Sequence, residues 1–162
     1  MLAGANHLLK YEIVPAEMAH VEPIARRCRQ ADIDELWATA AVLPAQAIEM
    51  GLRDSVYSRT WLIDGEPAVI GGIREVAQGG ILWLVTTDLM ERHQRAFLIE
   101  SRKEIEWAKA NYNMLWNYID ARNLKAVRWL KWTGFEIGEA VSYGIFKKPF
   151  YPFWYWRERM VA

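Results

Sequence analysis

The chain of 162 residues is 52% hydrophobic and carries 20 basic and 20 acidic side chains, so its formal net charge is zero. This length predicts one compact domain over residues 1–162. The balanced charge gives no electrostatic footprint for nucleic acid or an anionic membrane, so we expect neither as a partner. A single cysteine, Cys28, excludes an internal disulfide framework. No apolar run reaches the about 18 residues of a spanning helix and no signal-peptide layout opens the chain, which predicts a cytosolic protein.

The first quarter of the chain predicts one strand and three helices. The strand covers residues 11–14. Residues 17–30 predict an amphipathic helix because apolar side chains recur every three or four positions, at Val21, Ile24, Ala25 and Cys28. A second helix over residues 32–41 would turn one side inward, formed by Ile33, Leu36, Trp37 and Ala40. A third, short helix follows Pro44.

A hairpin is predicted next. Residues 60–63 and 68–70 read as strands joined by Asp64-Gly65, since this dipeptide supplies the positive φ angles of a type I′ turn. Gly71-Gly72 marks a bulge or a close backbone approach. Residues 81–85 form an uninterrupted apolar run, which predicts a central strand buried on both faces.

The second half predicts a crossover between parallel strands. Residues 91–112 form the longest helix, and a strand over residues 115–120 follows it, so the two strands around this helix are expected to be parallel neighbours. A short helix then opens at Asn123, a favoured N-cap, and ends at Gly134, a favoured C-cap. Further strands start at Phe135 and near residues 143–147.

These elements predict an α/β (α+β) fold. Its centre is a mixed, mostly antiparallel sheet with helices on both faces and one splayed parallel pair of strands. Ligands of such sheets bind where parallel strands separate at their carboxyl ends. The crevice is therefore expected near residues 86–88 and 120–123.

The spacing of Asn123, Ala126, Gly134 and Phe135 resembles the segment N-x-x-A-x-x-x-Y-x-x-x-G-F of the GNAT acetyltransferase superfamily. The resemblance implies a GNAT-like fold that binds acetyl-coenzyme A between the fourth and fifth strands and passes the acetyl group to an amine. The residues that it implies for coenzyme binding are Val85, Arg92, Gln94, Arg95, Ala96 and Asn123.

The sequence departs from the GNAT pattern at two places. Leu130 stands seven residues after Asn123, where the family has the tyrosine that protonates the departing thiolate. Leucine cannot donate a proton, and the loss of general-acid help typically costs about 10²–10⁴ in rate. The family's glycine-rich pyrophosphate loop corresponds to residues 88–96, which contain no glycine and bring in the acids Asp88 and Glu91.

Candidates for the remaining catalytic roles are few. A GNAT-type base could be drawn from Glu66, Glu75 or Asp120, and Tyr118 is the nearest alternative source of a proton. His93 is expected to be a surface residue. No pattern of metal ligands is present, so we expect no metal.

A narrower resemblance is to tailed-phage proteins grouped with the internal virion protein of T7-like podoviruses. The segments that carry it are residues 84–88, 91–93, 97–101 and 117–123, with Trp129-Leu130 and Gly134-Phe135. It implies a phage protein, present in the host cytoplasm during infection and packaged in or attached to the virion. Its partners would be virion proteins or other phage or host proteins.

The C-terminal segment 149–159 is rich in aromatic residues and is a candidate docking surface, because exposed aromatic side chains are enriched in interface hot spots. The docking residues would be Phe150, Phe153, Trp154 and Trp156. The alternative, that these rings close the core, is left open.

Three hypotheses about function remain. The preferred one is a GNAT-fold phage protein with degenerate acetyltransferase motifs that acts through protein association. The rival is an active acetyl-coenzyme A-dependent N-acetyltransferase that modifies a host or phage protein or a small amine. The third is binding of the coenzyme or of a peptide without turnover.

Overall fold

The computed structural model describes residues 8–158. Within them an eight-stranded sheet carries helices on its two faces. The strands are β1 (Tyr11–Pro15), β2 (Tyr57–Ile63), β3 (Glu66–Val76), β4 (Gly79–Thr86), β5 (Met114–Asp120), β6 (Glu136–Ile137), β7 (Val141–Tyr143) and β8 (Lys148–Trp156). The helices are the 3₁₀ turn η1 (Met18–His20), α1 (Val21–Arg26), α2 (Gln30–Ala40), α3 (Pro44–Asp54), α4 (Asp88–Arg92), α5 (Gln94–Asn111) and α6 (Leu124–Trp132).

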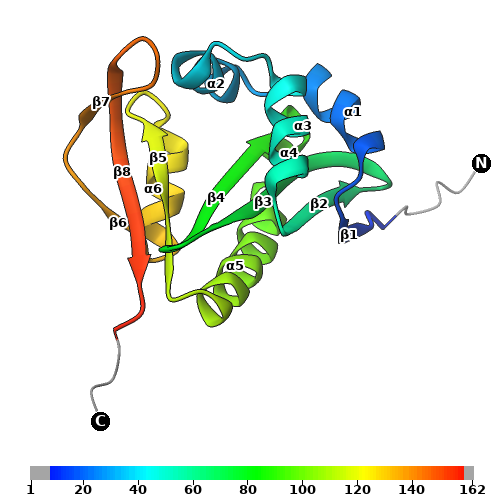
Figure 1. The fold of residues 1–162 in the computed structure, drawn as a ribbon. Helices are drawn as coiled ribbons and strands as arrows, with labels where there is room; N and C mark the ends of the chain where they lie inside the picture. The colour runs from blue at the N-terminus through cyan, green and yellow to red at the C-terminus, as the bar shows by residue number, and fades with distance from the viewer. Residues whose placement is uncertain (1–7, 159–162) are drawn as a thin grey trace, which may run out of the picture.

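The strand order is β1-β2-β3-β4-β5-β8-β6, and β7 pairs with β8. Every pairing is antiparallel except that of β4 with β5, which is parallel. The predicted mixed sheet and its one parallel pair are therefore confirmed. In Figure 1, β4 and β5 begin side by side and diverge toward their carboxyl ends, where α2 lies.

The β2–β3 hairpin has the predicted turn, with φ +50° at Asp64 and +81° at Gly65. The sheet register shifts in β2, between Trp61 and Leu62. Gly72 marks a close approach instead: a Cβ there would lie 2.6 Å from the carbonyl oxygen of Tyr57.

The parallel pairing of β4 with β5 is short. Only Gly80 with Leu115 and Ile81 with Trp116 are in register, after which the two strands separate. We call the space between them the V. The expectation that residues 81–85 are buried on both faces is wrong for most of them: only Val85 is buried, residues 81–83 are partly exposed and Leu84 is 39% exposed. At Leu84 the strand β5 no longer runs beside β4, so the side chain lacks the cover that a neighbouring strand would give.

The side chain of Asn117 explains where the V opens. Its Nδ2 donates to the carbonyl oxygen of Leu82 at 2.6 Å, and its Oδ1 accepts from the amide of Tyr118 at 2.8 Å. A side-chain amide thus makes hydrogen bonds at the point where a parallel ladder would continue. Asparagine is depleted in strands, and here it ends the pairing of β4 with β5.

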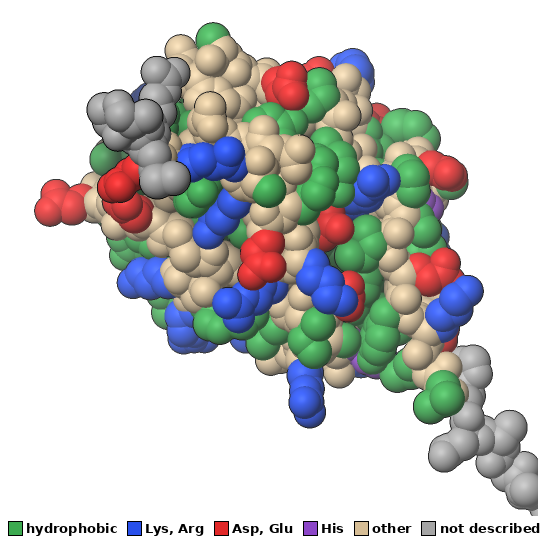
Figure 2. All heavy atoms as spheres, turned by 90° about the horizontal axis from the view of Figure 1, so that it is seen from below, with side chains coloured by type: hydrophobic (Ala, Val, Ile, Leu, Met, Phe, Trp, Pro, Cys, Tyr) green, Lys and Arg blue, Asp and Glu red, His purple; other side chains and the backbone are tan. Residues whose placement is uncertain are grey.

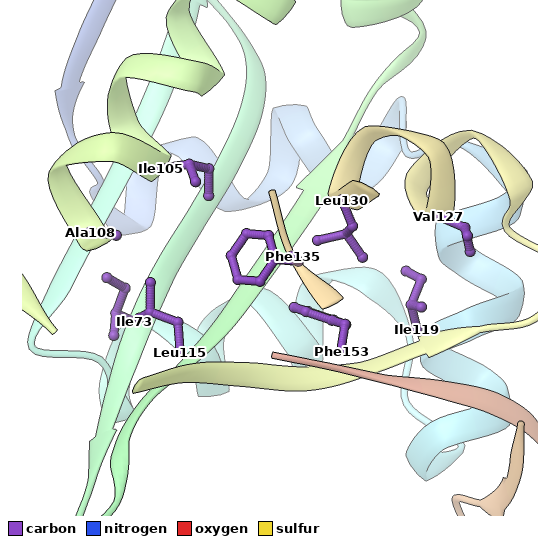
Figure 3. Packing of buried hydrophobic residues seen from close by; sticks show 9 residues of the cluster. All are labelled: Ile73, Ile105, Ala108, Leu115, Ile119, Val127, Leu130, Phe135 and Phe153. Carbon is purple, nitrogen blue, oxygen red and sulfur yellow. The ribbon is translucent and has the colours of Figure 1, made fainter. Parts of the chain in front are cut away.

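The core on one face of the sheet is built with α5 and α6. Figure 3 shows Ile105 and Ala108 of α5, and Val127 and Leu130 of α6, around side chains of β3, β5 and β8. On the other face, α1 and α3 pack on β3 and β4 through Val21, Ile24, Ile48, Ile70 and Val85. Side chains alternate between the two faces of the sheet along a strand. Consecutive residues of β4, and likewise of β5, therefore contact helices on opposite faces.

Two predicted helices are interrupted. The helix predicted over residues 17–30 ends at Arg26, and the helix predicted over residues 91–112 is broken at His93 into α4 and α5. The inward face predicted for α2 is also wrong in part, since Trp37 is 49% exposed whereas Asp32 is 8% exposed. The buried face of α2 is rotated relative to the predicted apolar face, because α2 packs against the rest of the protein through polar side chains.

The C-terminal aromatic segment is part of the sheet. β8 pairs with β5, β6 and β7, and Phe150 and Phe153 are buried within it. The expectation that these two rings form a docking surface is therefore wrong; they close the core. Trp154 is half-buried and Trp156 is exposed. Residue 159, the end of the predicted segment, lies outside the described residues.

The face of the molecule seen from below carries basic, acidic and hydrophobic side chains side by side (Figure 2). None of the helices in residues 8–158 is long and apolar enough to cross a membrane.

The position of β8 generates a test of the fold. A chain that ends after Lys148 should fail to fold, because β5, β6 and β7 would lose their shared partner and the core would lose Phe150 and Phe153. Circular dichroism and size-exclusion chromatography measure the outcome. A chain that ends after Glu158 is the control and should stay folded; a folded, cooperatively melting chain ending at Lys148 would contradict the assignment.

Candidate functional site

Helix α2 lies across the wide end of the V and is bonded to the end of β4. The Asp32 carboxylate accepts from the backbone amide of Thr86 at 2.9 Å and from its hydroxyl at 2.5 Å, both through Oδ2. The backbone groups of successive residues in a strand point in opposite directions within the sheet. Because the amide of Thr87 donates to β3, the amide of Thr86 points the other way, into the V. Asp32 therefore takes the place of a neighbouring strand at the end of β4.

Glu35, one helical turn later, makes the matching contact with β5. Its Oε2 accepts from the backbone amide of Asp120 at 3.1 Å. Between the two acids lies Asn123, whose Nδ2 is 3.4 Å from Asp32 Oδ1 and 3.4 Å from Glu35 Oε2. We call Asp32, Glu35 and Asn123 the carboxylate bridge, because together they join the separated ends of β4 and β5.

The charges around the bridge are only partly balanced. Arg29 lies 3.9 Å from Asp32 and donates to Glu91 at 3.0 Å, while Arg122 is paired with Asp120 at 2.7 Å. Burial, reinforced by the charge of Asp32, raises the pKa of Glu35 to about 8. Burial also raises the pKa of Asp32, against the hydrogen bonds from Thr86. Glu35 therefore holds its proton at neutral pH.

Asn123 is at the predicted N-cap position of α6, but its side chain makes no capping hydrogen bond. Its amide group points to the two acids instead, and its Oδ1 is buried without a hydrogen-bond partner among residues 8–158. The predicted C-cap is confirmed, since Gly134 has φ +89° and the amide of Phe135 donates to Leu130. Asn123 is thus explained by the bridge and not by capping.

A cavity of about 1010 Å³ includes the V and extends along the sheet to residues of β1, β2 and β3. Its lining includes side chains from both faces of the sheet, so it passes between β4 and β5. On the side of α5 and α6 it is lined by Phe97, Ile105 and Leu130. On the other side, which carries α2 and α3, it is lined by four aromatic side chains that we call the aromatic chamber: Trp83, Trp116, Tyr118 and Tyr143.

The two acids in the region of the predicted pyrophosphate loop, Asp88 and Glu91, are ion-paired. Asp88 accepts from Arg27 at 2.8 Å, and Glu91 accepts from Arg29. The Arg27 guanidinium lowers the pKa of the Asp88 carboxyl. The two arginines come from the connection between α1 and α2, which is also bonded to the end of β4 through the Arg29 amide and the Thr86 carbonyl. Residues 88–92 therefore form a short helix fixed by charge pairs, where the family has a glycine-rich loop.

The predicted coenzyme residues do not all lie at the V. Gln94, at the start of α5, and Asn123 line the cavity, whereas Arg92 is exposed and lies 3.5 Å from Asp88. Arg95 is exposed beside Leu98 and Trp132 and is not part of the cavity lining, and Ala96 packs on the core around Trp61. Val85 also lines the cavity, but it is 3% exposed and packs with α1 and α3.

Of the predicted catalytic candidates, only Tyr118 lines the cavity, stacked on Tyr143 at 4.1 Å. Asp120 is buried and its carboxylate is paired with Arg122, while Glu75 is exposed at the narrow end of the V. His93 lies outside the cavity lining and contacts the Tyr11 hydroxyl at 3.1 Å. The general-acid position, Leu130, is 3% exposed within the core of Figure 3.

Sequence reasoning missed Asp32 and Glu35. Residues 32, 35, 36 and 39 share one face of α2, and all four line the cavity. That spacing was the available signal, but acids on an amphipathic helix are normally solvent-exposed. Asn117, the polar residue in the middle of an apolar strand, was the corresponding signal for the opening of the V.

Residues 8–158 contain no group of three or more His, Cys, Asp or Glu side chains placed to hold a metal ion. The Cys28 thiol is half-buried beside Asp32, and burial raises its pKa to about 12. It is therefore a weak nucleophile at neutral pH.

The chain matches no protein-family model and no curated protein sequence. Solved structures resemble it along nearly its whole length. Ard1 from Thermoplasma volcanium is 15% identical with a TM-score of 0.68, covering 92% of this chain and 99% of its own. The ribosomal-protein-S18-alanine N-acetyltransferase from Escherichia coli is 15% identical with a TM-score of 0.62, covering 94% and 99%.

A third similar structure is the spermidine N-acetyltransferase from Vibrio cholerae in complex with CoA and spermine. It is 11% identical, with a TM-score of 0.64, and the match covers 90% of this chain and 95% of the other. At these identities the likeness concerns the fold. Together with the parallel β4–β5 pair in an otherwise antiparallel sheet, it shows that the chain has the GNAT fold.

The bridge should be a main source of stability. Asp32→Ala leaves the buried amide and hydroxyl of Thr86 without an acceptor, so we expect the free energy of unfolding to fall by about 3 kcal/mol. Urea denaturation measures the change. The control is Asp34→Ala on the exposed side of the same helix, which should change stability by less than about 1 kcal/mol. Equal effects of the two substitutions would refute the bridge.

The raised pKa of Glu35 predicts a pH dependence of stability. Between its ordinary pKa of 4.5 and about 8, the folded state binds a proton that the unfolded state has released. The free energy of unfolding should therefore fall as pH rises through this window, at a rate approaching about 1 kcal/mol per pH unit from this residue. Glu35→Gln should remove that slope in urea denaturation between pH 5 and 8. Parallel profiles for the native and substituted chains would be inconsistent with a buried, protonated Glu35.

Proposed function

We propose that this chain is a GNAT-fold protein of a tailed bacteriophage that acts mainly through association with other proteins and has lost most acetyl-transfer chemistry. The observation that carries the proposal is the buried Leu130. This residue lies on the cavity side of α6, two helical turns after Asn123. A leucine there donates no proton to a departing thiolate, a deficit of about 10²–10⁴ in rate.

The carboxylate bridge supports the same proposal. The Thr86 amide is occupied by Asp32, and the Thr86 carbonyl by the Arg29 amide. An extended ligand that paired with β4 through the wide end of the V would have to displace both contacts. A hydrogen bond to a charged group, such as that from the Thr86 amide to Asp32, contributes about 1.5–3 kcal/mol. Displacing it would weaken binding of a coenzyme arm along this strand.

An exposed apolar surface is available for association. It lies where the β7–β8 turn meets the end of α2, and we call it the apolar rim: Trp37, Leu43, Val141, Ile145 and Phe146, each more than 40% exposed. Trp37 and Phe146 stack at 6.3 Å. The Ile145 amide donates to the Thr39 carbonyl at 3.1 Å, which fixes the turn on α2.

The resemblance to T7-like internal virion proteins supplies the partner of the apolar rim, a protein of the virus particle. Exposed apolar patches mark interaction sites, and within the apolar rim Trp37 and Phe146 are in direct contact. The protein would then occur in the host cytoplasm during infection and in, or attached to, the particle. Of the predicted docking residues, Trp156 remains exposed, at the far end of β8.

A second candidate is an acetyl-coenzyme A-dependent N-acetyltransferase. It is favoured by the cavity that passes between β4 and β5, whose volume is in the range of ligand sites. The coenzyme would supply an acetyl thioester. Gln94 and Lys125 on the cavity lining could contact its phosphates, and α5 begins without an acidic residue in its first turn. Glu35 would accept the proton that an amine loses on attack only in its deprotonated form, which becomes the major form above its pKa of about 8.

Coenzyme binding and turnover separate the two candidates. We expect no thiol release above about a hundredth of the rate of a functional GNAT enzyme when the chain is mixed with acetyl-coenzyme A and amines. Calorimetry with up to millimolar acetyl-coenzyme A measures binding, and a thiol reagent measures turnover. Steady thiol release that is lost in Glu35→Gln would overturn the proposal in favour of the enzyme.

A separate experiment on infected cells tests the association with the virus particle. Mass spectrometry of purified particles should detect the native chain, whereas the double substitution Trp37→Ser and Phe146→Ser should remove it from particles. Both side chains are about half exposed, so the variant should stay folded, as its thermal melt would show. A native chain absent from particles would count against the virion assignment.

A further inference from the structure

The zero net charge of the chain conceals an uneven distribution between the helices on the two faces of the sheet. The helices α5 and α6 together carry seven basic and three acidic side chains, whereas α1, α2 and α3 together carry two basic and six acidic ones. Arg95, Arg128 and Lys131, on α5 and α6, are exposed and make no ion pair within residues 8–158. The α5–α6 face is therefore electropositive and attracts partners of negative charge.

The outward side of α5 forms a regular stripe of residues. Phe97, Ile105 and Ala108 of this helix are buried against the sheet. Residues spaced by three or four positions share one side of a helix, and the side opposite these buried residues carries residues 95, 99, 102 and 106. From residue 95 to residue 106 the stripe is about 16 Å long, which equals three helical turns.

A shallow groove of about 520 Å³ follows this stripe, and we call it the α5 groove. Its apolar lining consists of Leu98 and Ile99 of α5 and Trp132 of α6, which are 38%, 50% and 48% exposed. A partner that covers these side chains removes apolar surface from water, which favours binding. Ile99 lies outside the lining of the cavity at the V, so the α5 groove presents a surface of its own.

The cations in the middle of the α5 groove are paired within the chain. The Arg102 guanidinium lies over the Trp132 ring, 5.3 Å from its centre, and donates to Glu106 at 3.2 Å. Lys103 donates to Glu100 at 2.8 Å. The contact with Arg102 thus holds Trp132 against α5, and the two acids neutralise the middle of the groove.

The unpaired cations lie toward the end of the groove where α5 begins. Arg95 lines that end. Arg128 of α6 stands four residues before Trp132, and therefore on the same side of the helix, and lines the neighbouring cavity together with Leu98. A partner in the groove therefore meets apolar side chains along its length and two unpaired cations near one end.

This pattern fits an acidic amphipathic helix better than a nucleic acid or a membrane. A helix that lies in a groove places apolar side chains at positions i, i+3 or i+4 and i+7 along one side, and the α5 groove has room for three turns. Arg102 covers one face of the Trp132 ring, so that face is closed to base stacking, and Glu100 and Glu106 repel phosphate groups. The apolar side chains line a hollow, which a helix fills better than a flat membrane surface does.

We propose that the α5 groove docks an acidic amphipathic helix of a partner protein. The apolar side of this helix packs on Leu98, Ile99 and Trp132, and its carboxylates pair with Arg95 and Arg128. Opposite charges across an interface steer the association and fix its register. Because α5 and α2 lie on opposite faces of the sheet, docking here depends neither on the apolar rim nor on the virion assignment.

Fluorescence anisotropy with a labelled synthetic peptide tests the proposal on the full chain. The probe is a helical peptide of about 18 residues, with leucines spaced by four, three and four positions and glutamates on both flanks of this stripe. We expect a Kd of about 10–100 µM at about 50 mM salt, and weaker binding at about 300 mM salt because salt screens the ion pairs. A peptide with lysine in place of every glutamate, and one of the same composition without the leucine stripe, should each bind at least about ten times more weakly.

Exposed residues give matched variants of the protein. Ile99→Ser and Arg95→Glu should each weaken binding of the acidic peptide by about fivefold or more. Arg53→Glu, at an exposed arginine of α3 on the other face of the sheet, should leave it unchanged. All three side chains are exposed, so the variants should stay folded, as thermal melts would show.

Three results would overturn the proposal: no binding at about 1 mM acidic peptide, equal binding of the lysine peptide, or an undiminished affinity in Ile99→Ser or Arg95→Glu. Duplex DNA and phosphatidylglycerol vesicles are the competing probes. Binding of either one that is lost in the same two variants would also overturn it, since another class of partner would then fit the groove.

Discussion

The architecture depends on how the separated ends of β4 and β5 are held. A parallel pair that stops after two register positions leaves the backbone groups of both strands exposed toward the V, and such groups are costly when buried without partners. The carboxylate bridge satisfies one amide on each strand, Thr86 on β4 and Asp120 on β5. The sheet can therefore stay open without a neighbouring strand in the gap.

The cost of the bridge is a concentration of negative charge. Placing Asp32 and Glu35 on successive turns of α2 raises the pKa of both acids through burial and, for Glu35, through the charge of Asp32. Asn123 lowers this cost because one amide group donates toward both carboxyl groups. Protonation of Glu35 removes the rest. The same arrangement leaves Asn123 Oδ1 buried without a hydrogen-bond partner among residues 8–158.

Most of the fold could be predicted from local patterns. The Asp64-Gly65 turn, the helix between the parallel strands and the left-handed Gly134 each have a short-range cause that the sequence displays. The bridge depends instead on residues about 90 positions apart. Asp32 looks like a surface acid, and Asn123 like a helix cap, until the fold brings them within 3.4 Å. The rotation of α2 was missed for the same reason, because its buried face is polar.

The two sides of the cavity, one lined by α5 and α6 and the other by α2 and α3, differ in their functional side chains. Asn123 and Leu130 are separated by seven residues, so they lie on nearly the same side of α6, and both line the cavity. The α5–α6 face has leucine where acetyl transfer needs a proton donor. The α2–α3 face keeps an ordered aromatic wall and the buried carboxyl group of Glu35. Because these features lie on the opposite face of the sheet from Leu130, the loss of a proton donor at position 130 does not remove them.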